Sequence, residues 1–395
     1  MVKRLWSMTL LISSLLAMAS GAQAAWWPQP PHIAAKSWVL IDARSGQVLA
    51  SDNPNEQLPP ASLTKLMTLY LAFEDLKTGR IGLNDHVPVS KKAWHMGGSK
   101  MFIDPSMHPT VNQLLHGIST DSGNDAVIAL TQYIAGTEAA FVSRMNAKAE
   151  ELGMTHTHFA DTTGYPIADH YSSALDMARL GVALWRDFPQ YYPLFKEHSY
   201  TFDNITQSNR NLLLWRDQLV DGIKTGHTDA AGYCQVTSAQ KGNTRFVTAV
   251  FGTDSKEARA QQSRAILDFA FRNFVTMRPA EHDIRREVAV YDGKKDELWL
   301  VPEKPMWISV PRGLERYVKF HLHYQAPLRA PIAKGQILGT IEAVAKIPGK
   351  DKAQVLGSVA MEANSSVARA SWIGRKWDAL RLWWHASDQA AQAKE

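Results

Sequence analysis

Pro60-Ala-Ser-Leu-Thr-Lys65 is the stretch of this sequence that decides the fold. Apolar residues recur at helical spacing directly after it, which predicts a helix from Ser62 to about Leu76. Residues three apart lie on one helical face, so the Ser62 hydroxyl and the Lys65 amine are expected to point into the same space. The positive end of the helix dipole would also favour negative charge that develops near Ser62.

The chain around this helix predicts strands at both ends and helices in the middle. Two apolar runs, Ser37–Asp42 and Gln47–Ala50, flank a short turn with glycine and predict a hairpin. Helical patterns extend over 111–118, 124–134, 138–152 and 173–185, strand patterns over 222–225, 232–239 and 246–251, and a last helical pattern over 255–274. Strands that are distant in sequence must therefore pair in one sheet, with a helical subdomain inserted between them.

The last third of the chain has a different sequence pattern. From Arg278 to about Ala363, short apolar runs are separated by proline and glycine, which predicts a separate small all-β domain. A helix is expected from Ser365 to Ser387, with an apolar stripe on one face and basic residues beside it. The stripe is Ile373, Trp377, Leu380 and Trp384, and the basic residues are Arg375, Lys376 and Arg381. Such a helix is typical of segments that lie on an anionic membrane surface, and docking on the protein itself is the alternative.

The N-terminus predicts a secretory signal with cleavage after Ala24. Lys3 and Arg4 precede a short apolar run, and Ala22-Gln23-Ala24 provides small residues at the cleavage site. A membrane anchor is the alternative, but the run is short for a span of about 20 residues. The single cysteine, Cys234, excludes an intramolecular disulfide and is expected to be a buried structural residue.

The composition argues against nucleic acid as a partner. The 395 residues carry a formal net charge of only +5 at pH 7. No basic face with interleaved aromatic residues is present in the sequence.

Two further motifs supply what a serine nucleophile needs: a charge stabiliser and groups that bind the reacting amide. Ser122-Gly-Asn124 lies in a short loop that enters a helix, and Lys224-Thr-Gly226 ends a predicted strand. Each pattern alone is weak, because Ser238-Ala-Gln-Lys241, Ser51-Asp-Asn53 and Lys77-Thr-Gly79 match them too. Only the Ser62, Ser122 and Lys224 set has the order of nucleophile helix, helical insert and edge strand.

This set resembles the motifs of penicillin-binding proteins and class A β-lactamases. The wider stretches are similar to low-molecular-weight D-alanyl-D-alanine carboxypeptidases of Gram-negative bacteria, and they are Pro60–Lys65, Asp121–Asp125, Gln207–Asn211 and Asp221–Thr228. The resemblance implies an α/β (α+β) domain of the serine β-lactamase/transpeptidase type with an inserted helical subdomain, a small all-β domain and a C-terminal amphipathic helix. The expected bounds are 1–24 for the signal peptide, 34–277 for the penicillin-binding D,D-carboxypeptidase domain, 278–363 for the all-β domain and 364–388 for the membrane-anchor helix.

The resemblance also implies a reaction. The terminal D-alanine would be removed from peptidoglycan pentapeptide stems through an acyl-enzyme on Ser62, with Lys65 as its base and without a metal or cofactor. Ser122 would pass the proton to the leaving D-alanine nitrogen, Asn124 would hold the substrate amide, and Lys224 would set the electrostatics. β-Lactams would acylate and inhibit the enzyme, which is expected in the periplasm, attached peripherally to the outer face of the inner membrane.

Substrate binding is expected from the Lys224 strand and two arginines. Gly226 would let the substrate backbone approach as an added strand. By resemblance, the backbone N–H groups of Ser62 and His227 would form the oxyanion hole. Because the substrate ends in a carboxylate, cationic or hydroxyl partners are needed. Thr225 and Arg210 are the candidates, with Arg259 in support.

A loop beside the site departs from the family pattern in detail. Thr163-Gly-Tyr-Pro-Ile-Ala-Asp-His-Tyr-Ser-Ser173 is the counterpart of a Gly-rich stretch that ends in His-Ser-Ser. Tyr165-Pro166 and the extra aromatic Tyr171 are expected to affect rate and preference rather than reaction type. Ser99 matches a family position near the site.

Parts of the sequence are compatible with three other functions. A class A β-lactamase needs a carboxylate base after the second motif, but no glutamate lies between Glu151 and Glu197, where Asp161, Asp169, Asp176 and Asp187 are the carboxylates. A zinc peptidase would need a site built on His156, His158 and Asp161, whose spacing does not suggest one. A non-catalytic wall-binding scaffold would keep the fold without turnover, and the intact motifs count against it.

Overall fold

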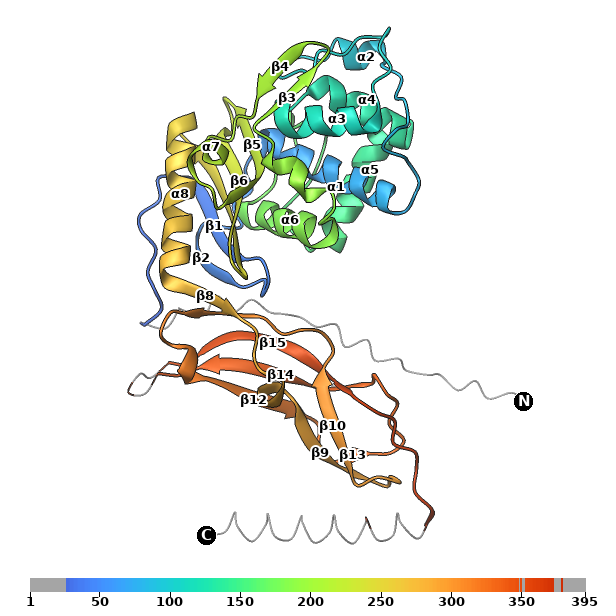
Figure 1. Cartoon of the computed structure of the whole chain (residues 1–395), viewed down its shortest axis with the longest axis vertical. Helices are drawn as coiled ribbons and strands as arrows, with labels where there is room; N and C mark the ends of the chain where they lie inside the picture. The colour runs from blue at the N-terminus through green and yellow to red at the C-terminus, as the bar shows by residue number, and fades with distance from the viewer. Residues whose placement is uncertain (1–25, 348, 350–351, 373–377, 379–395) are drawn as a thin grey trace, which may run out of the picture.

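We describe the protein from a computed structural model, in which residues 26–347, 349, 352–372 and 378 are described (Figure 1). A domain of mixed helices and strands lies at one end of an elongated molecule, and a domain of strands lies at the other. The predicted signal peptide, residues 1–24, falls outside the described residues.

A five-stranded antiparallel sheet organises the first domain, in the order β2-β1-β7-β6-β5. The strands are β1 (Ser37–Asp42), β2 (Val48–Asp52), β5 (Val220–Thr228), β6 (Gly232–Lys241) and β7 (Thr244–Thr253). Ser37 pairs with Phe251, so the N-terminal hairpin joins strands from the far side of the helical region, as predicted. β5 lies at the edge of the sheet, with one side free of a strand partner in this sheet.

Helices cover both faces of the sheet. One face packs against α6 (Ala174–Asp187) and, behind it, α1 (Lys65–Lys77), α2 (Lys91–Trp94), α3 (Val111–His116), α4 (Asn124–Ala135) and α5 (Glu138–Glu151). The other face packs against α8 (Lys256–Asn273). Gly181 lets α6 approach closely, because a Cβ there would lie 2.8 Å from Ile223 Cδ1 on β5. A sheet that joins sequence-distant strands and is covered by helices on both faces confirms the predicted fold class.

Two predicted helices contain an irregular turn, and both turns lie at the motifs. The helix predicted from Ser62 starts with the 3₁₀ turn η1 (Ala61–Thr64) before α1. The helix predicted over 111–118 ends at His116 and continues as the π turn η2 (Gly117–Asp121). Irregular turns of this kind are frequent at functional sites, because they re-aim side chains that a regular helix would direct elsewhere.

Short elements connect the helical subdomain to β5. They are the 3₁₀ turn η3 (Tyr192–Lys196), the hairpin β3 (Ser199–Phe202) and β4 (Ile205–Ser208), and α7 (Leu213–Arg216). Cys234 is fully buried in β6, and burial raises the pKa of its thiol to about 11, which fits the predicted structural role.

The second domain is built from strands, as predicted. A six-stranded sheet has the order β12-β14-β15-β10-β9-β13, and β11 pairs separately with β8. The elements are β8 (Phe274–Met277), α9 (Glu281–Ile284), β9 (Arg286–Tyr291), β10 (Glu297–Pro302), β11 (Ile308–Pro311), η4 (Glu315–Tyr317), β12 (Val318–Tyr324), β13 (Leu328–Arg329), β14 (Ile337–Ala345) and β15 (Gln354–Ala363). Its apolar residues form one continuous cluster with the α8 face of the first domain.

Asp42, at the end of β1, joins the two domains. This fully buried carboxylate accepts hydrogen bonds from the backbone N–H of Arg44 (2.8 Å) and from the hydroxyls of Thr276 and Ser309, the latter at 3.0 Å. The Arg44 guanidinium lies 4.7 Å from the ring centroid of Trp307 in the second domain. A satisfied buried carboxylate therefore fixes both domains to the first strand.

The helix predicted from Ser365 does not begin there. Residues 365–371 are not helical, and Val367 exchanges backbone hydrogen bonds with Ile332 at 2.9 and 3.0 Å. Val367 is 1% exposed, so burial in the β domain outweighs the local helical pattern. The rest of the predicted helix, residues 373–377 and 379–387, lies outside the described residues.

No single helix within the described ranges combines the length and the apolar composition that a membrane span requires. The bent pair of α4 and α5, with an angle of 85° between the helices, meets those two criteria only when both are taken together.

Candidate active site

Ser62 and Lys65 form the centre of the site. The η1 turn brings Lys65 Nζ to 2.8 Å from Ser62 Oγ, while α1 keeps the whole lysine side chain at 0% exposure. Burial lowers the pKa of Lys65 to about 7, because an ammonium loses its hydration there. An amine of this kind is substantially neutral near pH 7, so it is able to accept the serine proton.

Ser122 and Asn124 face the site from the junction of η2 and α4. Ser122 has the left-handed conformation, with φ of 62°, and its buried Oγ has no hydrogen-bond partner within the described parts of the chain. Asn124 Nδ2 donates to Gly97 O at 2.8 Å, and Asn124 Oδ1 is buried without a partner in the same parts. Because buried polar atoms are normally paired, these orphaned oxygens indicate a place where a ligand supplies the donors.

The β5 strand forms the opposite wall. Lys224 is 3% exposed, and burial lowers its pKa well below the ordinary value, with the nearby charge of Lys65 adding to the effect. Gly226 touches the nucleophile turn, because a Cβ there would lie 3.0 Å from Pro60 O and 3.1 Å from Ser62 N. Thr225 is nearly buried beside it, at 7% exposure. The absence of a side chain at Gly226 therefore lets the strand approach the nucleophile.

The two arginines have different positions. Arg210 Nη1 donates to Ser99 Oγ at 3.0 Å and to Asp121 O at 2.9 Å, and its residue surface is exposed. Arg259 is buried on α8 and donates to Gly226 O at 3.4 Å and to Arg210 O at 3.1 Å. Arg259 therefore supports the backbone of the substrate-binding groups from behind the sheet. His227 is exposed, and its ring lies against that of Tyr233, with a centroid distance of 4.0 Å and an interplanar angle of 31°.

Two carboxylates near the motifs were not predicted as part of the site. The Asp125 carboxylate accepts the backbone N–H groups of Met101 and Phe102, each at 2.8 Å, and so shapes the loop that touches Asn124. Burial raises the pKa of Asp121 to about 7, although the charge of Arg210 opposes the rise. Both residues directly flank Ser122-Gly-Asn124. This position next to a catalytic motif is the sequence feature that could have identified them as part of the site.

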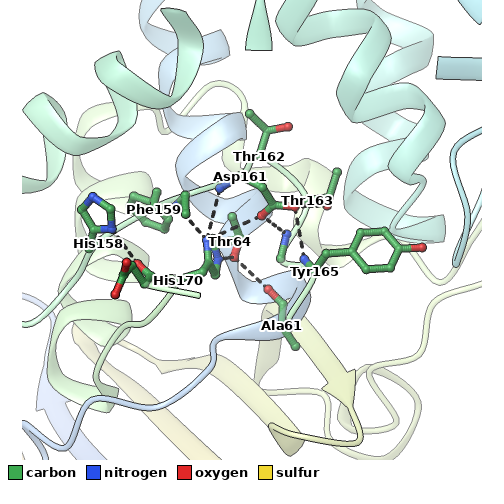
Figure 2. Close-up of polar contacts among 12 residues, drawn as sticks. Ala61, Thr64, His158, Phe159, Asp161, Thr162, Thr163, Tyr165 and His170 are labelled. Atoms are coloured by element: carbon green, nitrogen blue, oxygen red, sulfur yellow. Dashed lines mark hydrogen bonds and ion pairs between the residues drawn. The ribbon is translucent and has the colours of Figure 1, made fainter. Parts of the chain in front are cut away.

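The loop over residues 161–165 completes the site. The backbone carbonyl of Thr163 accepts a hydrogen bond from Lys65 Nζ at 2.7 Å. Asp161 holds this turn, since its carboxylate accepts from Thr163 Oγ1 at 2.5 Å, Gly164 N at 2.8 Å and Tyr165 N at 3.2 Å (Figure 2). A contact made by a backbone carbonyl has no side-chain signature, so sequence reasoning missed it.

Asp161 and His158, which the alternative functions would use, already have hydrogen-bond partners. Both oxygens of Asp161 belong to the turn, and His158 Nδ1 lies 2.6 Å from Asp169 O. Among the residues with described positions, no group of three His, Cys, Asp or Glu side chains is arranged to hold a metal ion. The geometry instead offers the Ser62 hydroxyl as a nucleophile, the buried Lys65 amine and the β5 strand with its hydrogen-bond donors. This combination suits acyl transfer.

Comparisons with known proteins agree with this chemistry. Residues 24–255 match the family "D-alanyl-D-alanine carboxypeptidase", and residues 275–363 match "Penicillin-binding protein 5, C-terminal domain". D-alanyl-D-alanine carboxypeptidase DacA of Escherichia coli (strain K12) is 41% identical over 325 residues, which cover 80% of either chain. DacC of the same strain is 39% identical over 366 residues, which cover 90% of either chain.

Solved structures agree in fold. Penicillin-binding protein 5 from Haemophilus influenzae is 36% identical, with a TM-score of 0.81, and the match covers 87% of this chain and 100% of that one. Penicillin-binding protein 6B from Escherichia coli is 34% identical, with a TM-score of 0.70, and the match covers 85% and 98% of the two chains.

Proposed function

This chain belongs to the D-alanyl-D-alanine carboxypeptidase family of penicillin-binding proteins, and from that premise we propose how its site removes the terminal D-alanine of peptidoglycan stem peptides. The observation that carries the proposal is the fully buried Lys65 amine, 2.8 Å from Ser62 Oγ. Burial lowers the pKa of this amine to about 7, so a large fraction of it is a free base at neutral pH.

Acylation begins when Ser62 Oγ attacks the carbonyl carbon of the penultimate D-alanine. The Oγ proton passes to Lys65 Nζ as the Oγ–C bond forms. The oxyanion that develops is bound by the backbone N–H groups of Ser62 and His227, and removing one such donor typically costs about 10²–10³ in rate. Ser122 then relays the proton held on Lys65 to the departing nitrogen as the C–N bond breaks, which releases D-alanine and leaves Lys65 neutral again.

Water completes the reaction by attacking the ester carbonyl on Ser62, and its proton passes to Lys65. As the Oγ–C bond breaks, Lys65 returns that proton to Ser62 Oγ and the shortened peptide is released. A β-lactam undergoes the same attack, but its ring amide keeps the leaving nitrogen attached to the acyl group. The acyl-enzyme is therefore stable enough to inhibit the enzyme.

The other site residues bind the substrate. Asn124 receives the peptide amide, which the orphaned Oδ1 supports. Thr225 and Arg210 bind the terminal carboxylate, and Lys224 adds positive potential. Arg259 holds Gly226 and Arg210 through their carbonyls.

Ser62→Ala tests the nucleophile. The variant is expected to lose both benzylpenicillin labelling, followed by intact-mass spectrometry, and D-alanine release from a pentapeptide that ends in D-Ala-D-Ala. Ser51→Ala, at an exposed serine of β2, is the matched control and should behave as the unchanged protein. A penicillin adduct on any other residue contradicts the assignment, whereas normal labelling of the unchanged protein without D-alanine release would favour the scaffold function.

We further propose export to the periplasm through residues 1–24 and peripheral attachment to the outer face of the inner membrane through the helix expected within 364–388. We propose 34–277 as the catalytic unit and 278–363 as the all-β unit, with β8 at the end of the first range pairing with β11 of the second. The stripe of Ile373, Trp377, Leu380 and Trp384, beside three basic residues, supports membrane attachment.

Truncation tests the anchor. Ending the chain after Ser371 keeps Val367, which is buried in the β domain, and removes the stripe. The truncated protein is expected to leave the membrane fraction while retaining penicillin labelling. Membrane association that persists after this truncation contradicts the proposal.

A further inference from the structure

Asp161 is connected through Thr163 to the Lys65 amine that the proposed mechanism uses. Its carboxylate accepts from Thr163 Oγ1 (2.5 Å) and Gly164 N (2.8 Å), and the Thr163 carbonyl accepts from Lys65 Nζ (2.7 Å). Figure 2 shows Asp161 and Thr163 side by side in this turn. Asp161 is thus separated from the acylation machinery by a single residue.

We propose that Asp161 is a positioning residue for acylation: it fixes the 161–165 turn so that the Thr163 carbonyl orients the Lys65 amine toward Ser62, and its negative charge stabilises the ammonium formed there. This inference rests on the proposed function of Ser62 and Lys65. It assigns to Asp161 a role that is distinct from touching the substrate.

The Thr163 carbonyl orients Lys65 because a neutral amine has a fixed tetrahedral geometry. Such an amine has two N–H donors and one lone pair. When one N–H points at the Thr163 carbonyl, the remaining tetrahedral positions are fixed, and one of them meets Ser62 Oγ at 2.8 Å. A Thr163 carbonyl that moved away would leave the amine free to rotate its lone pair elsewhere. Small losses of alignment at a reacting centre are costly, about 10²-fold for 1 Å.

Carboxylates and cations around Lys65 act on its pKa in opposite directions. Asp161 and, more weakly, Asp125 raise the pKa of Lys65, whereas Arg210 lowers it. The Lys224 amine is coupled to Lys65 by mutual repulsion. Asp161 is the largest of the charge effects that oppose the desolvation of Lys65. Its charge therefore helps the buried amine to hold the proton it takes from Ser62.

The far end of the same loop is anchored to the nucleophile turn. His170 Nδ1 accepts from Ala160 N at 2.9 Å, so Nε2 carries the proton and donates to Thr64 Oγ1 at 2.8 Å. Thr64 Oγ1 in turn donates to Ala61 O at 2.9 Å. Burial lowers the pKa of His170, which keeps this neutral form. Hydrogen bonds thus fix this loop at both ends, with Asp161 at one end and His170 at the other (Figure 2).

The test compares Asp161→Asn with Asp169→Asn. Both variants remove one negative charge from the same loop, but Asp169 is exposed and is not among the charges that act on Lys65. The measurement is the second-order rate of benzylpenicillin acylation from pH 5 to pH 9, with D-alanine release in parallel. Thermal unfolding reports on whether each variant is folded.

Asp161→Asn is expected to move the midpoint of the rising limb to lower pH by about one unit, the small end of what a nearby opposite charge produces. Its plateau rate should fall about tenfold, because a weaker base accepts the proton less well. Asp169→Asn should keep the midpoint and the plateau. Asp161→Ala, which also removes the acceptors of the turn, should lose more of the plateau rate than Asp161→Asn.

An unchanged midpoint in folded Asp161→Asn overturns the inference, as does an equal shift in Asp169→Asn. A purely structural role for Asp161 would reduce the amplitude and the unfolding temperature without moving the midpoint. The outcome is separable from the proposed function, since Ser62→Ala and D-alanine release by the unchanged protein test that function without any change at Asp161.

Discussion

Replacing Lys65 by methionine is expected to abolish acylation and to stabilise the fold. Burial lowers the pKa of Lys65 from 10.5 to about 7. At about 1.4 kcal/mol per unit, that shift means that folding loses about 5 kcal/mol at pH below 7, as an upper bound. Methionine has a similar length and no charge, but it leaves the Thr163 carbonyl without its donor, which costs about 1–3 kcal/mol. The net gain at pH 6 is therefore about 2–4 kcal/mol.

The pH dependence gives this prediction its sign. Between pH 7 and pH 10.5 the unfolded chain holds a proton on Lys65 that the folded chain has released, so the free energy of unfolding rises with pH in that window. From pH 7 to pH 9 the Lys65 contribution to this rise is about 2 kcal/mol, because half of the folded chains still hold the proton at pH 7. Lys65→Met should lose this part of the slope. The lowered pKa of Lys224 contributes a rise of the same sign in both proteins.

Urea denaturation at pH 6, 7 and 9, followed by tryptophan fluorescence, measures both effects. Lys241→Met, at an exposed lysine of β6, is the matched control and should leave the stability and its pH slope unchanged. If Lys65→Met is less stable than the unchanged protein at pH 6, the reasoning is refuted. The same conclusion follows if both proteins have the same slope between pH 7 and pH 9.

Two further predictions concern close contacts. Gly226→Ala should slow penicillin acylation by about 10²-fold, since its Cβ would lie 3.0 Å from Pro60 O and displace the strand or the nucleophile turn; an unchanged acylation rate would contradict this. Asp42→Ala should lower the free energy of unfolding by about 3 kcal/mol in calorimetry, because Thr276 and Ser309 lose a buried acceptor. Unaltered stability of that variant would show that the junction does not depend on Asp42.

Local patterns in the sequence predicted much of the site. Ser62 and Lys65 share a turn of chain, so their spacing alone implied that they meet. The pairing of sequence-distant strands such as β1 and β7 in one sheet also followed from pattern, because helices fill the middle of the region between apolar runs. The order of the five strands was not predicted, whereas the edge position expected for the Lys224 strand agrees with the place of β5.

Features that depend on tertiary contacts could not be predicted. The carbonyl that holds Lys65 belongs to Thr163, but any residue type could supply a carbonyl. The left-handed conformation of Ser122 follows from a π turn that the helical periodicity of 111–118 does not encode. Residues 365–371 carry a helical pattern, and yet Val367 is recruited into the β domain, because burial outweighs a weak local propensity.

The pairing of β1 with β7 also governs when the protein acquires its shape. Ser37 has no sheet neighbour on that side until Phe251 is available. A chain that is being synthesised or exported therefore completes the sheet late. Loop closure over such a separation is slow, and an incomplete chain exposes the apolar faces of its first hairpin. A chain that stops before Thr244 lacks this partner strand, so we expect it to be captured by chaperones or degraded rather than to persist as a smaller enzyme.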